Sequence, residues 1–286
     1  MTNRLLIFLA VLLSAVVASA SDNAENCIAA RRLFNQSISA PSPAAEIKLL
    51  EEAAGLCRDP EVLGPIYNNL GHAHERLGRL AQAFFYYRQA VRTKPDLAIA
   101  YVGGADLYAA VGDAYSAFVL YQKAQRYGYP EDKLQERRDR AARTWPRDLV
   151  VYFGKNQANL DLAARERLEG LVEHCKQESG GVSFVIKGFT CELGSRRHNQ
   201  ELARRRALAV TRYLRRQLGS RVRATTITAH GEDNRAVPEP DETARILNRR
   251  VRLRVLAGQT ATGRLSSSGS TGPDFEMRLC GPFNSR

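Results

Sequence analysis

The spacing of apolar residues along the chain changes character near residue 148. Beyond it, short apolar runs typical of strands alternate with longer segments whose apolar residues recur at helical spacing. In the first helical segment, Leu162, Leu168, Leu171 and Val172 are expected to face inward. Strands alternating with helices of this length favour crossover units packed on one sheet. We therefore predict an α/β sandwich over residues 148–256, with strands at 149–153, 182–188, 223–230 and 250–256 and helices at 160–178, 195–218 and 243–247.

The first half of the chain repeats one pattern in two units that start at Gly64 and Ala98, 34 residues apart. Small residues let the two helices of a unit approach, and large aromatic residues fill the gap to the next unit. Gly78 and Gly112 permit the turn between these helices, where a side chain would be costly at positive φ. One unit cannot bury its own apolar face, so neighbours must stack. The matching positions are Tyr67, Leu70, Gly71, Gly78, Ala83, Tyr87, Ala90 and Pro95 in the first unit, and Tyr101, Ala105, Tyr108, Gly112, Ala117, Tyr121 and Ala124 in the second.

This pattern resembles the tetratricopeptide repeat, so residues 25–145 are expected to form an all-α solenoid. A degenerate unit over 25–59 is expected to supply the first repeat, and the polar segment 130–144 a capping helix. The resemblance implies a concave groove that holds an unidentified envelope protein. The alternative, that the array only stiffens or dimerises the protein, remains open. The residues expected in the groove are Asn68, His72, Arg76, Val102, Asp106 and Ala109.

Four short motifs occur in the second half of the chain. Their order and intervals resemble those of the OmpA-like peptidoglycan-binding domain. The resemblance implies a βαβαβ fold with a final strand, and an α+β protein overall. The motifs are Gly188-Phe189-Thr190-Cys191-Glu192-Leu193-Gly194-Ser195, then Asn199 with Leu202, Arg206 and Ala207, then Gly231-Glu232, and finally Asn248-Arg249-Arg250-Val251.

The resemblance also implies a binding pocket where the second strand ends and the second helix begins. In the family this pocket holds the diaminopimelate of a peptidoglycan stem peptide. Arg206 occupies the position that binds a ligand carboxylate, and a guanidinium suits this task because its planar fork matches a carboxylate. Thr190 and Asn199 are expected to complete the polar lining, with Arg249 or Arg250 approaching from the last strand.

The chain departs from the family at Cys191, where the motif has an aspartate that binds the ligand's ammonium group. Three alternatives remain open. Glu192 supplies the missing carboxylate, or the pocket recognises only a carboxylate through Arg206, or the pocket has lost cell-wall binding.

The N-terminus has the composition of a cleaved export signal. Arg4 precedes an apolar run over residues 5–17, and the small residues 18–20 form a cleavage pattern. The run is shorter than the roughly 20 residues that cross a hydrocarbon core. We therefore predict a signal peptide at 1–20, no membrane span after its cleavage, and a periplasmic protein peripheral to the outer membrane and cell wall.

An exported chain with five cysteines is expected to contain disulfides. Cys27 and Cys57 lie at the start of one predicted helix and the end of the next, which an antiparallel hairpin brings together. Cys175 and Cys191 are expected to be too far apart to pair, because the strand between them spans about 30 Å. Cys280 lies in a Gly- and Ser-rich tail over 257–286, expected to be flexible, and could reach either.

Composition narrows the class of function. A net charge of +12 favours an anionic partner, but export makes nucleic acid the weakest candidate, so none is expected. The five histidines show no metal-ligand spacing, and no nucleophile motif appears, so we expect no metal, cofactor or catalysis. The leading hypothesis is a non-catalytic adaptor that binds peptidoglycan and a protein partner. The alternative is an envelope interaction scaffold whose pocket has lost or changed wall binding.

Overall fold

A computed structural model describes residues 23–145, 147–178, 180–238 and 242–257. The chain divides into two compact units, with the division between Gly103 and Gly104. The division falls within α5 (Ala98–Ala110). The sequence motifs suggested a later boundary, at residues 145–148. The earlier division arises because α6 (Ala114–Arg126) and α7 (Glu131–Thr144) pack within the second unit. The predicted signal peptide and tail lie outside the described residues.

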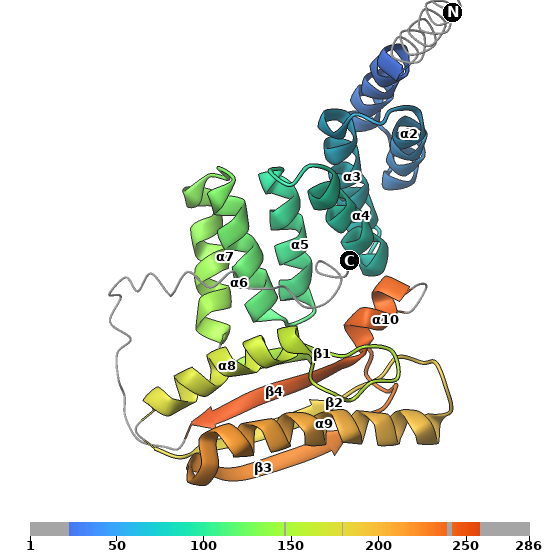
Figure 1. The fold of residues 1–286 in the computed structure, drawn as a ribbon. Helices are drawn as coiled ribbons and strands as arrows, with labels where there is room; N and C mark the ends of the chain where they lie inside the picture. The colour runs from blue at the N-terminus through green and yellow to red at the C-terminus, as the bar shows by residue number, and fades with distance from the viewer. Residues whose placement is uncertain (1–22, 146, 179, 239–241, 258–286) are drawn as a thin grey trace, which may run out of the picture. The chain divides into compact units, whose positions relative to one another are not determined.

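The first unit consists of antiparallel helices (Figure 1). A helix over residues 23–38 is followed by α2 (Pro43–Leu56), α3 (Pro60–Arg76), α4 (Leu80–Thr93) and the beginning of α5. Two helix starts are capped by side chains: Ser42 Oγ accepts from Ala45 N at 3.2 Å, and Asp59 Oδ1 accepts from Glu61 N at 3.0 Å. The helix over 23–38 and α2 form the pair expected of a degenerate first repeat.

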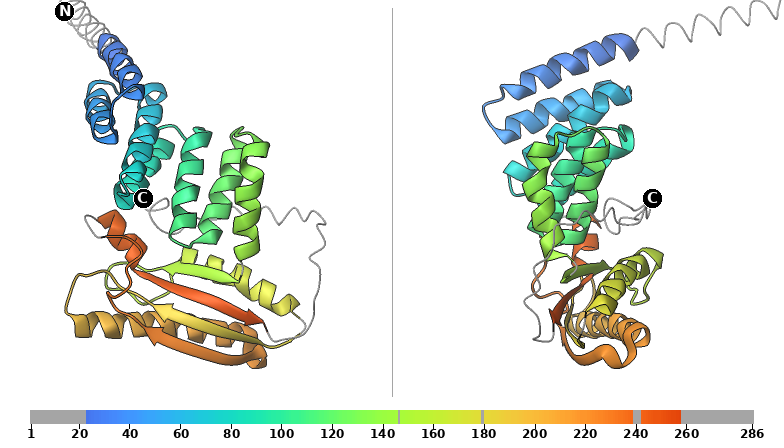
Figure 2. Two further views of the ribbon diagram at one scale, coloured as in Figure 1. Left: turned by 180° about the vertical axis from the view of Figure 1, so that it is seen from behind. Right: turned by 90° about the vertical axis from the view of Figure 1, so that its left-hand side faces the viewer.

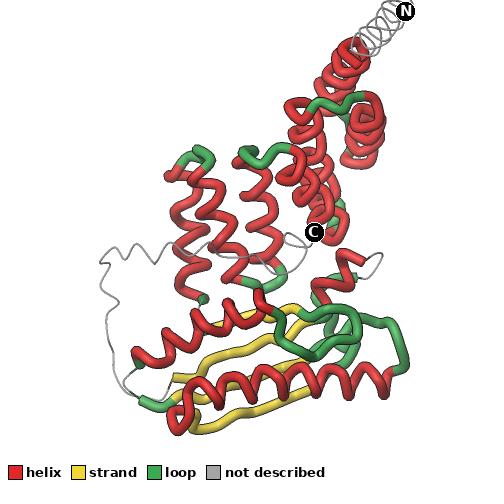
Figure 3. The backbone as a smooth tube through the Cα atoms, in the orientation of Figure 1, coloured by secondary structure: helices red, strands yellow, loops and turns green. Residues whose placement is uncertain are grey.

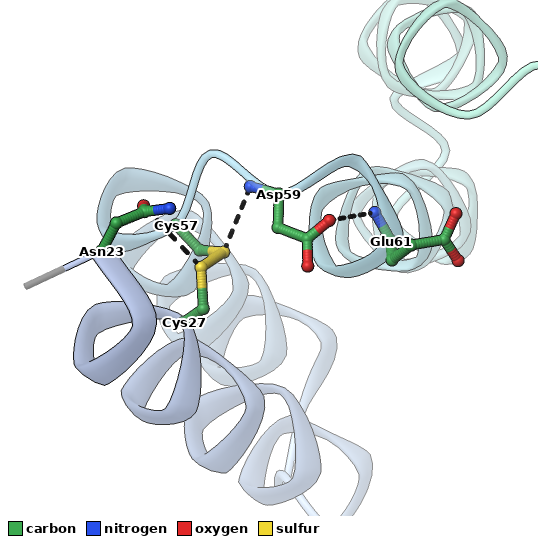
Figure 4. The surroundings of a disulfide bond; sticks show 5 residues. All are labelled: Asn23, Cys27, Cys57, Asp59 and Glu61. Atoms are coloured by element: carbon green, nitrogen blue, oxygen red, sulfur yellow. Dashed lines mark hydrogen bonds between the residues drawn. A yellow bond between two sulfur atoms is a disulfide. The ribbon is translucent and has the colours of Figure 1, made fainter. Parts of the chain in front are cut away.

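Cys27 and Cys57 form a disulfide that joins the first helix to the end of α2 (Figure 4). Their Cα atoms are 4.6 Å apart, so the antiparallel pair of helices brings the two residues within bonding distance, as the sequence suggested. The bridge borders an apolar core that is closed by the next helix. This core includes Ala30, Leu50, Ala53, Ile66 and Leu70.

Glycines explain how closely the repeat helices pack in the first unit. A Cβ atom at Gly71 of α3 would lie 2.8 Å from Cδ1 of Tyr87, and one at Gly103 of α5 would overlap the same ring. The Tyr87 ring is 3% exposed, and its hydroxyl donates to Glu75 Oε2 at 2.9 Å. Tyr87 therefore fills the space between repeats, as predicted, because two glycines leave room for it.

The second unit contains a four-stranded sheet with strand order β1-β4-β2-β3 (Figure 3). The strands are β1 (Asp148–Tyr152), β2 (Val182–Gly188), β3 (Val222–Ala229) and β4 (Arg250–Ala257). β2 and β3 are parallel, whereas β4 is antiparallel to both β1 and β2. The prediction of an all-α repeat region followed by an α/β domain is confirmed.

Two helices, α8 (Leu162–Gln177) and α9 (Arg196–Leu218), cover one face of the sheet (Figure 2). The short elements η1 (Gly219–Arg221) and α10 (Glu242–Asn248) precede β3 and β4. Leu168, Leu171 and Val172 of α8 are buried as expected. The prediction for Leu162 was wrong: it is 58% exposed, because it is the first residue of the helix, next to the N-cap Asp161.

A buried ion pair fastens α6 to the sheet edge within the second unit. Arg167 of α8 and Asp113, the N-cap of α6, have fully buried side chains and lie 3.1 Å apart. Arg167 Nη1 also donates to the carbonyl oxygen of Val150 in β1 at 2.7 Å, and Nη2 donates to Ser116 Oγ. The last repeat is therefore built into the α/β domain, which the sequence analysis did not anticipate.

Candidate functional site

The first motif, residues 188–195, runs from the end of β2 to the start of α9. Close packing explains Gly188, and helix capping explains Ser195. A Cβ atom at Gly188 would overlap the carbonyl oxygen of Ala203, so only glycine lets α9 pass this close to β2. Ser195 caps α9, with Oγ accepting from His198 N at 3.2 Å. The Thr190 amide donates to the carbonyl oxygen of Gly231 at 2.6 Å, which brings the first and third motifs together.

Arg206 lies at the centre of the site and is fully buried. Its guanidinium donates to three backbone carbonyl oxygens: Nε to Gln157 at 2.8 Å, Nη1 to Phe189 at 3.0 Å, and Nη2 to Gly154 at 3.1 Å. A guanidinium has five N–H groups. Arg206 therefore holds the loop after β1 against the loop after β2, and these three bonds leave two N–H groups.

The surroundings of Arg206 are unfavourable to its positive charge. Burial, and secondly the nearby charge of Arg249, lower the pKa of Arg206 to about 10, whereas Cys191 opposes the shift. Cys191 is a buried free cysteine, 7% exposed, so the position of the motif aspartate carries no carboxylate. Among the described residues, no carboxylate forms an ion pair with Arg206.

Two of the predicted lining residues are buried beside this centre. Thr190 is 1% exposed, and its hydroxyl oxygen has no hydrogen-bond partner within the described structure. Asn199, also 1% exposed, donates from Nδ2 to Glu232 Oε2 at 2.6 Å. The sequence analysis placed Glu232 in a motif but missed it as a site residue. Its carboxylate reaches the site because the loop after β3 folds back toward α9.

Glu192 is paired with an arginine at the surface. Its carboxylate forms an ion pair with Arg235 at 2.5 Å, and both side chains are more than 40% exposed. The structure thus gives Glu192 a surface partner.

Arg249 and Arg250, the two arginines of the last motif, have different partners. Arg249 donates to the carbonyl oxygen of Phe153 at 3.3 Å and pairs with Glu242 at 2.8 Å, next to Arg206. Arg250 instead lies over the Phe189 ring, 4.1 Å from its centroid. Asn248, which opens the motif, orients the preceding loop by accepting from the amides of Ala236 and Val237.

The expected groove residues of the repeats differ in exposure. Asn68 and Val102 are 8% and 4% exposed, so neither presents an open surface. His72 and Arg76 are exposed, and Arg76 pairs with Glu46 at 2.9 Å. In the second unit, Asp106 accepts from the Tyr121 hydroxyl at 2.6 Å and pairs with Arg137 at 2.9 Å.

The described residues were also compared with the requirements of a membrane span and of a metal site: neither is met. No helix there has both the length and the apolar character needed to span a bilayer. The same residues contain no group of three or more His, Cys, Asp and Glu side chains placed to hold a metal ion.

Two segments match known families. Residues 152–249 match the OmpA family, and residues 64–97 match the tetratricopeptide repeat. Over 106 residues, 37% of the chain, the sequence is 37% identical to a peptidoglycan-associated lipoprotein of Pseudomonas putida. The match spans 61% of the length of that relative.

Several solved structures are similar to part of the chain. The peptidoglycan-associated lipoprotein from Burkholderia pseudomallei is 23% identical, with 37% of this chain and 89% of that chain covered and a TM-score of 0.32. The C-terminal domain of Helicobacter pylori MotB is 19% identical, with 38% and 85% covered and a TM-score of 0.35. Scores this low carry no argument by themselves. The motifs, the sheet and the family matches together show that this chain carries an OmpA-like domain after a tetratricopeptide-repeat module.

Proposed function

We propose that the protein is a non-catalytic periplasmic adaptor that binds peptidoglycan through its OmpA-like domain and a protein partner through its repeats. The observation that carries the proposal is the arrangement around Arg206, whose guanidinium is held by three carbonyls with two N–H groups left. The identity with a peptidoglycan-associated lipoprotein supports the same ligand class. The repeat match supports a protein partner, because such arrays commonly present binding surfaces.

Diaminopimelate carries both ammonium and carboxylate groups, and the site offers a partner for each. Arg206 suits a carboxylate, because its remaining N–H groups belong to the two terminal nitrogens of the fork. Glu232, oriented by Asn199, is the carboxylate we assign to the ammonium group. This assignment differs from the sequence hypothesis in using Glu232 in place of Glu192, which pairs with Arg235.

The test is co-sedimentation of the purified protein with insoluble diaminopimelate-type peptidoglycan at two salt concentrations. Glu232→Gln and Thr190→Val are expected to leave most of the protein in the supernatant under conditions where the wild type pellets. Glu201→Gln, an exposed residue of α9, is the charge-matched control and is expected to pellet like the wild type. Thermal melting of each variant separates loss of binding from loss of folding.

Arg206→Ala is less informative alone, because it removes three hydrogen bonds between loops along with the ligand contact. Arg206→Lys retains the charge but loses the planar fork, so it is expected to weaken pelleting while the protein remains folded. Pelleting of the wild type only at low salt would indicate nonspecific attraction to the basic chain and would contradict the proposal.

Cys191 supports a second candidate, an envelope scaffold that does not bind the cell wall. Its thiol occupies the position of the family's aspartate, and Arg206 has no ion-pair partner among the described residues. Cys191→Asp separates the two candidates. A wild type that stays soluble while Cys191→Asp pellets would establish the scaffold, whereas a wild type that pellets specifically supports the adaptor.

A further inference from the structure

The face of the sheet opposite α8 and α9 is rich in basic side chains. Side chains alternate along a strand, so Arg250, Arg252 and Arg254 of β4 share this face, while Val251 and Leu253 are buried on the other. The register pairs Arg252 with Lys187 of β2, which extends the basic surface to the neighbouring strand. Figure 2 shows that both long helices lie on the same side of the sheet, away from this surface.

Only part of this charge is balanced within the protein. Asp148 pairs with Arg254 at 2.8 Å. For Lys187 and Arg252, the described residues provide no ion pair, although the two side chains stand opposite each other in register. Like charges directly opposite on neighbouring strands are destabilising. Two adjacent cations are therefore left without an ion-pair partner in the described part of the chain.

Arg250 adds a buried cation with unused hydrogen-bond donors. It is 5% exposed, its Nη2 donates to the carbonyl oxygen of Asn234 at 3.0 Å, and its guanidinium lies over the Phe189 ring. Nε and Nη1 have no hydrogen-bond partner within the described structure. Burial lowers the pKa of Arg250 to about 10. Burying charged N–H groups without partners is costly, and a nearby anion would reduce this cost.

These side chains line one cavity of about 770 Å³ in the second unit. The turn between α5 and α6 forms part of its wall. Gly112 lies in this turn with φ +80°, and a Cβ atom there would be 3.1 Å from Arg252 Nη2. The volume falls within the range of small-molecule sites, about 300–1,000 Å³. His230 also lines the cavity. Five of the charged lining residues are lysine or arginine and one, Asp148, is acidic, so the charge of the lining is predominantly positive.

We propose that this cavity binds a dianionic phosphate group through Lys187, Arg250 and Arg252. A phosphate monoester offers three acceptor oxygens and close to two negative charges at neutral pH, whereas a carboxylate offers two oxygens and one charge. Three neighbouring cations, two of them planar forks, match the phosphate better. The proposed peptidoglycan pocket is built on Arg206 of α9, whereas this cavity is lined by Lys187, Arg250 and Arg252 of the sheet. The two sites adjoin at Phe189, whose carbonyl oxygen accepts from Arg206 and whose ring lies under Arg250.

The test is isothermal titration of the purified full chain with inorganic phosphate, at constant ionic strength in chloride. Saturable binding is expected, and Arg252→Gln and Lys187→Gln are each expected to raise the dissociation constant at least tenfold. Arg212→Gln removes an exposed arginine from α9 and is the matched control, with an unchanged constant. Arg250 is buried, so its replacement would change folding as well as binding, and it is not used as a test by itself. Melting curves of the Lys187 and Arg252 variants verify their folding.

Vesicles containing phosphatidic acid present the same phosphate monoester at a membrane surface. They distinguish a lipid headgroup from a soluble phosphate as the ligand of the cavity. Binding of inorganic phosphate without binding to vesicles assigns the site to a soluble ligand. Vesicle binding that Lys187→Gln abolishes assigns it to a lipid headgroup. The absence of saturable binding to either, or an equal loss in Arg212→Gln, would overturn the proposal. The fraction of Arg252→Gln that co-sediments with peptidoglycan should equal that of the wild type. This outcome keeps the two proposals distinguishable.

Discussion

Gly188, at the end of β2, lies where α9 passes closest to the sheet. A methyl group there would overlap the carbonyl oxygen of Ala203, which belongs to the helix backbone and cannot rotate away. Gly188→Ala is therefore expected to destabilise the second unit by about 1–3 kcal/mol, measured by urea unfolding. Gly180→Ala is the control, because no atom lies within 4 Å of the added methyl group. Equal stability of the two variants would refute this packing constraint.

His74 of α3 makes the first unit sensitive to acid. The ring is 6% exposed and stacks on Tyr86, and neither ring nitrogen has a hydrogen-bond partner in the described structure. Burial, and secondly Arg79, lower the pKa of His74 below 6.5, with Glu51 opposing them. Between the lowered pKa and 6.5 the unfolded chain binds the proton more readily than the folded chain, so stability falls as the pH falls through this range.

Replacement of His74 by an uncharged residue tests this dependence. His74→Phe, which retains a ring for stacking, is expected to flatten the decline in melting temperature of the first unit between pH 7 and pH 5. His72→Gln, an exposed neighbour on the same helix, is expected to retain the wild-type decline. An unchanged decline in His74→Phe would assign the acid sensitivity to other groups.

At the scale of elements, the junction of α6, α8 and β1 depends on Arg167. Arg167→Met is expected to destabilise the second unit by about 3–5 kcal/mol, because it leaves Asp113 buried without its cation. Combining it with Asp113→Asn should recover part of this loss, since asparagine can still cap α6 without a buried charge. Denaturant unfolding measures the stability of the single and the double variant, with Arg165→Ala on the exposed side of α8 as control. A double variant no more stable than Arg167→Met would contradict this explanation.

The elements themselves were largely predictable from the sequence. β2 occupies the predicted range, and α9 begins one residue after its predicted start at Ser195, because hydrophobic periodicity is a local property of the sequence. The site was predictable only in part. The motifs identified Arg206, but its three carbonyl partners come from loops that meet only in the folded chain. Likewise, residue type alone does not distinguish the buried Arg167 from Arg165, the exposed arginine of the same helix.

At the scale of the whole molecule, the repeat pattern and the compact units divide the chain differently. Sequence periodicity assigns α5 and α6 to one repeat, whereas packing divides the chain at Gly103 and Gly104. The last repeat contributes Asp113 and Ser116 to the α/β domain, and its turn contributes Gly112 to the basic cavity. The second unit therefore depends on residues that the repeat pattern assigns to the solenoid.

Two fragments of the chain test which division describes an independently stable unit. A fragment over 104–257 keeps α6 and α7 with the sheet. A fragment over 148–257 removes two buried partners of Arg167, Asp113 and Ser116, and the α6 contacts of β1. The shorter fragment is expected to melt several degrees lower, since about 1 kcal/mol shifts the melting temperature of a domain this size by about 2–8 °C. Addition of Arg167→Met should lower the melting temperature of the longer fragment but change the shorter one little. If the two fragments melt together, α6 and α7 only lie against the domain, and the boundary at residue 148 defines the folding unit.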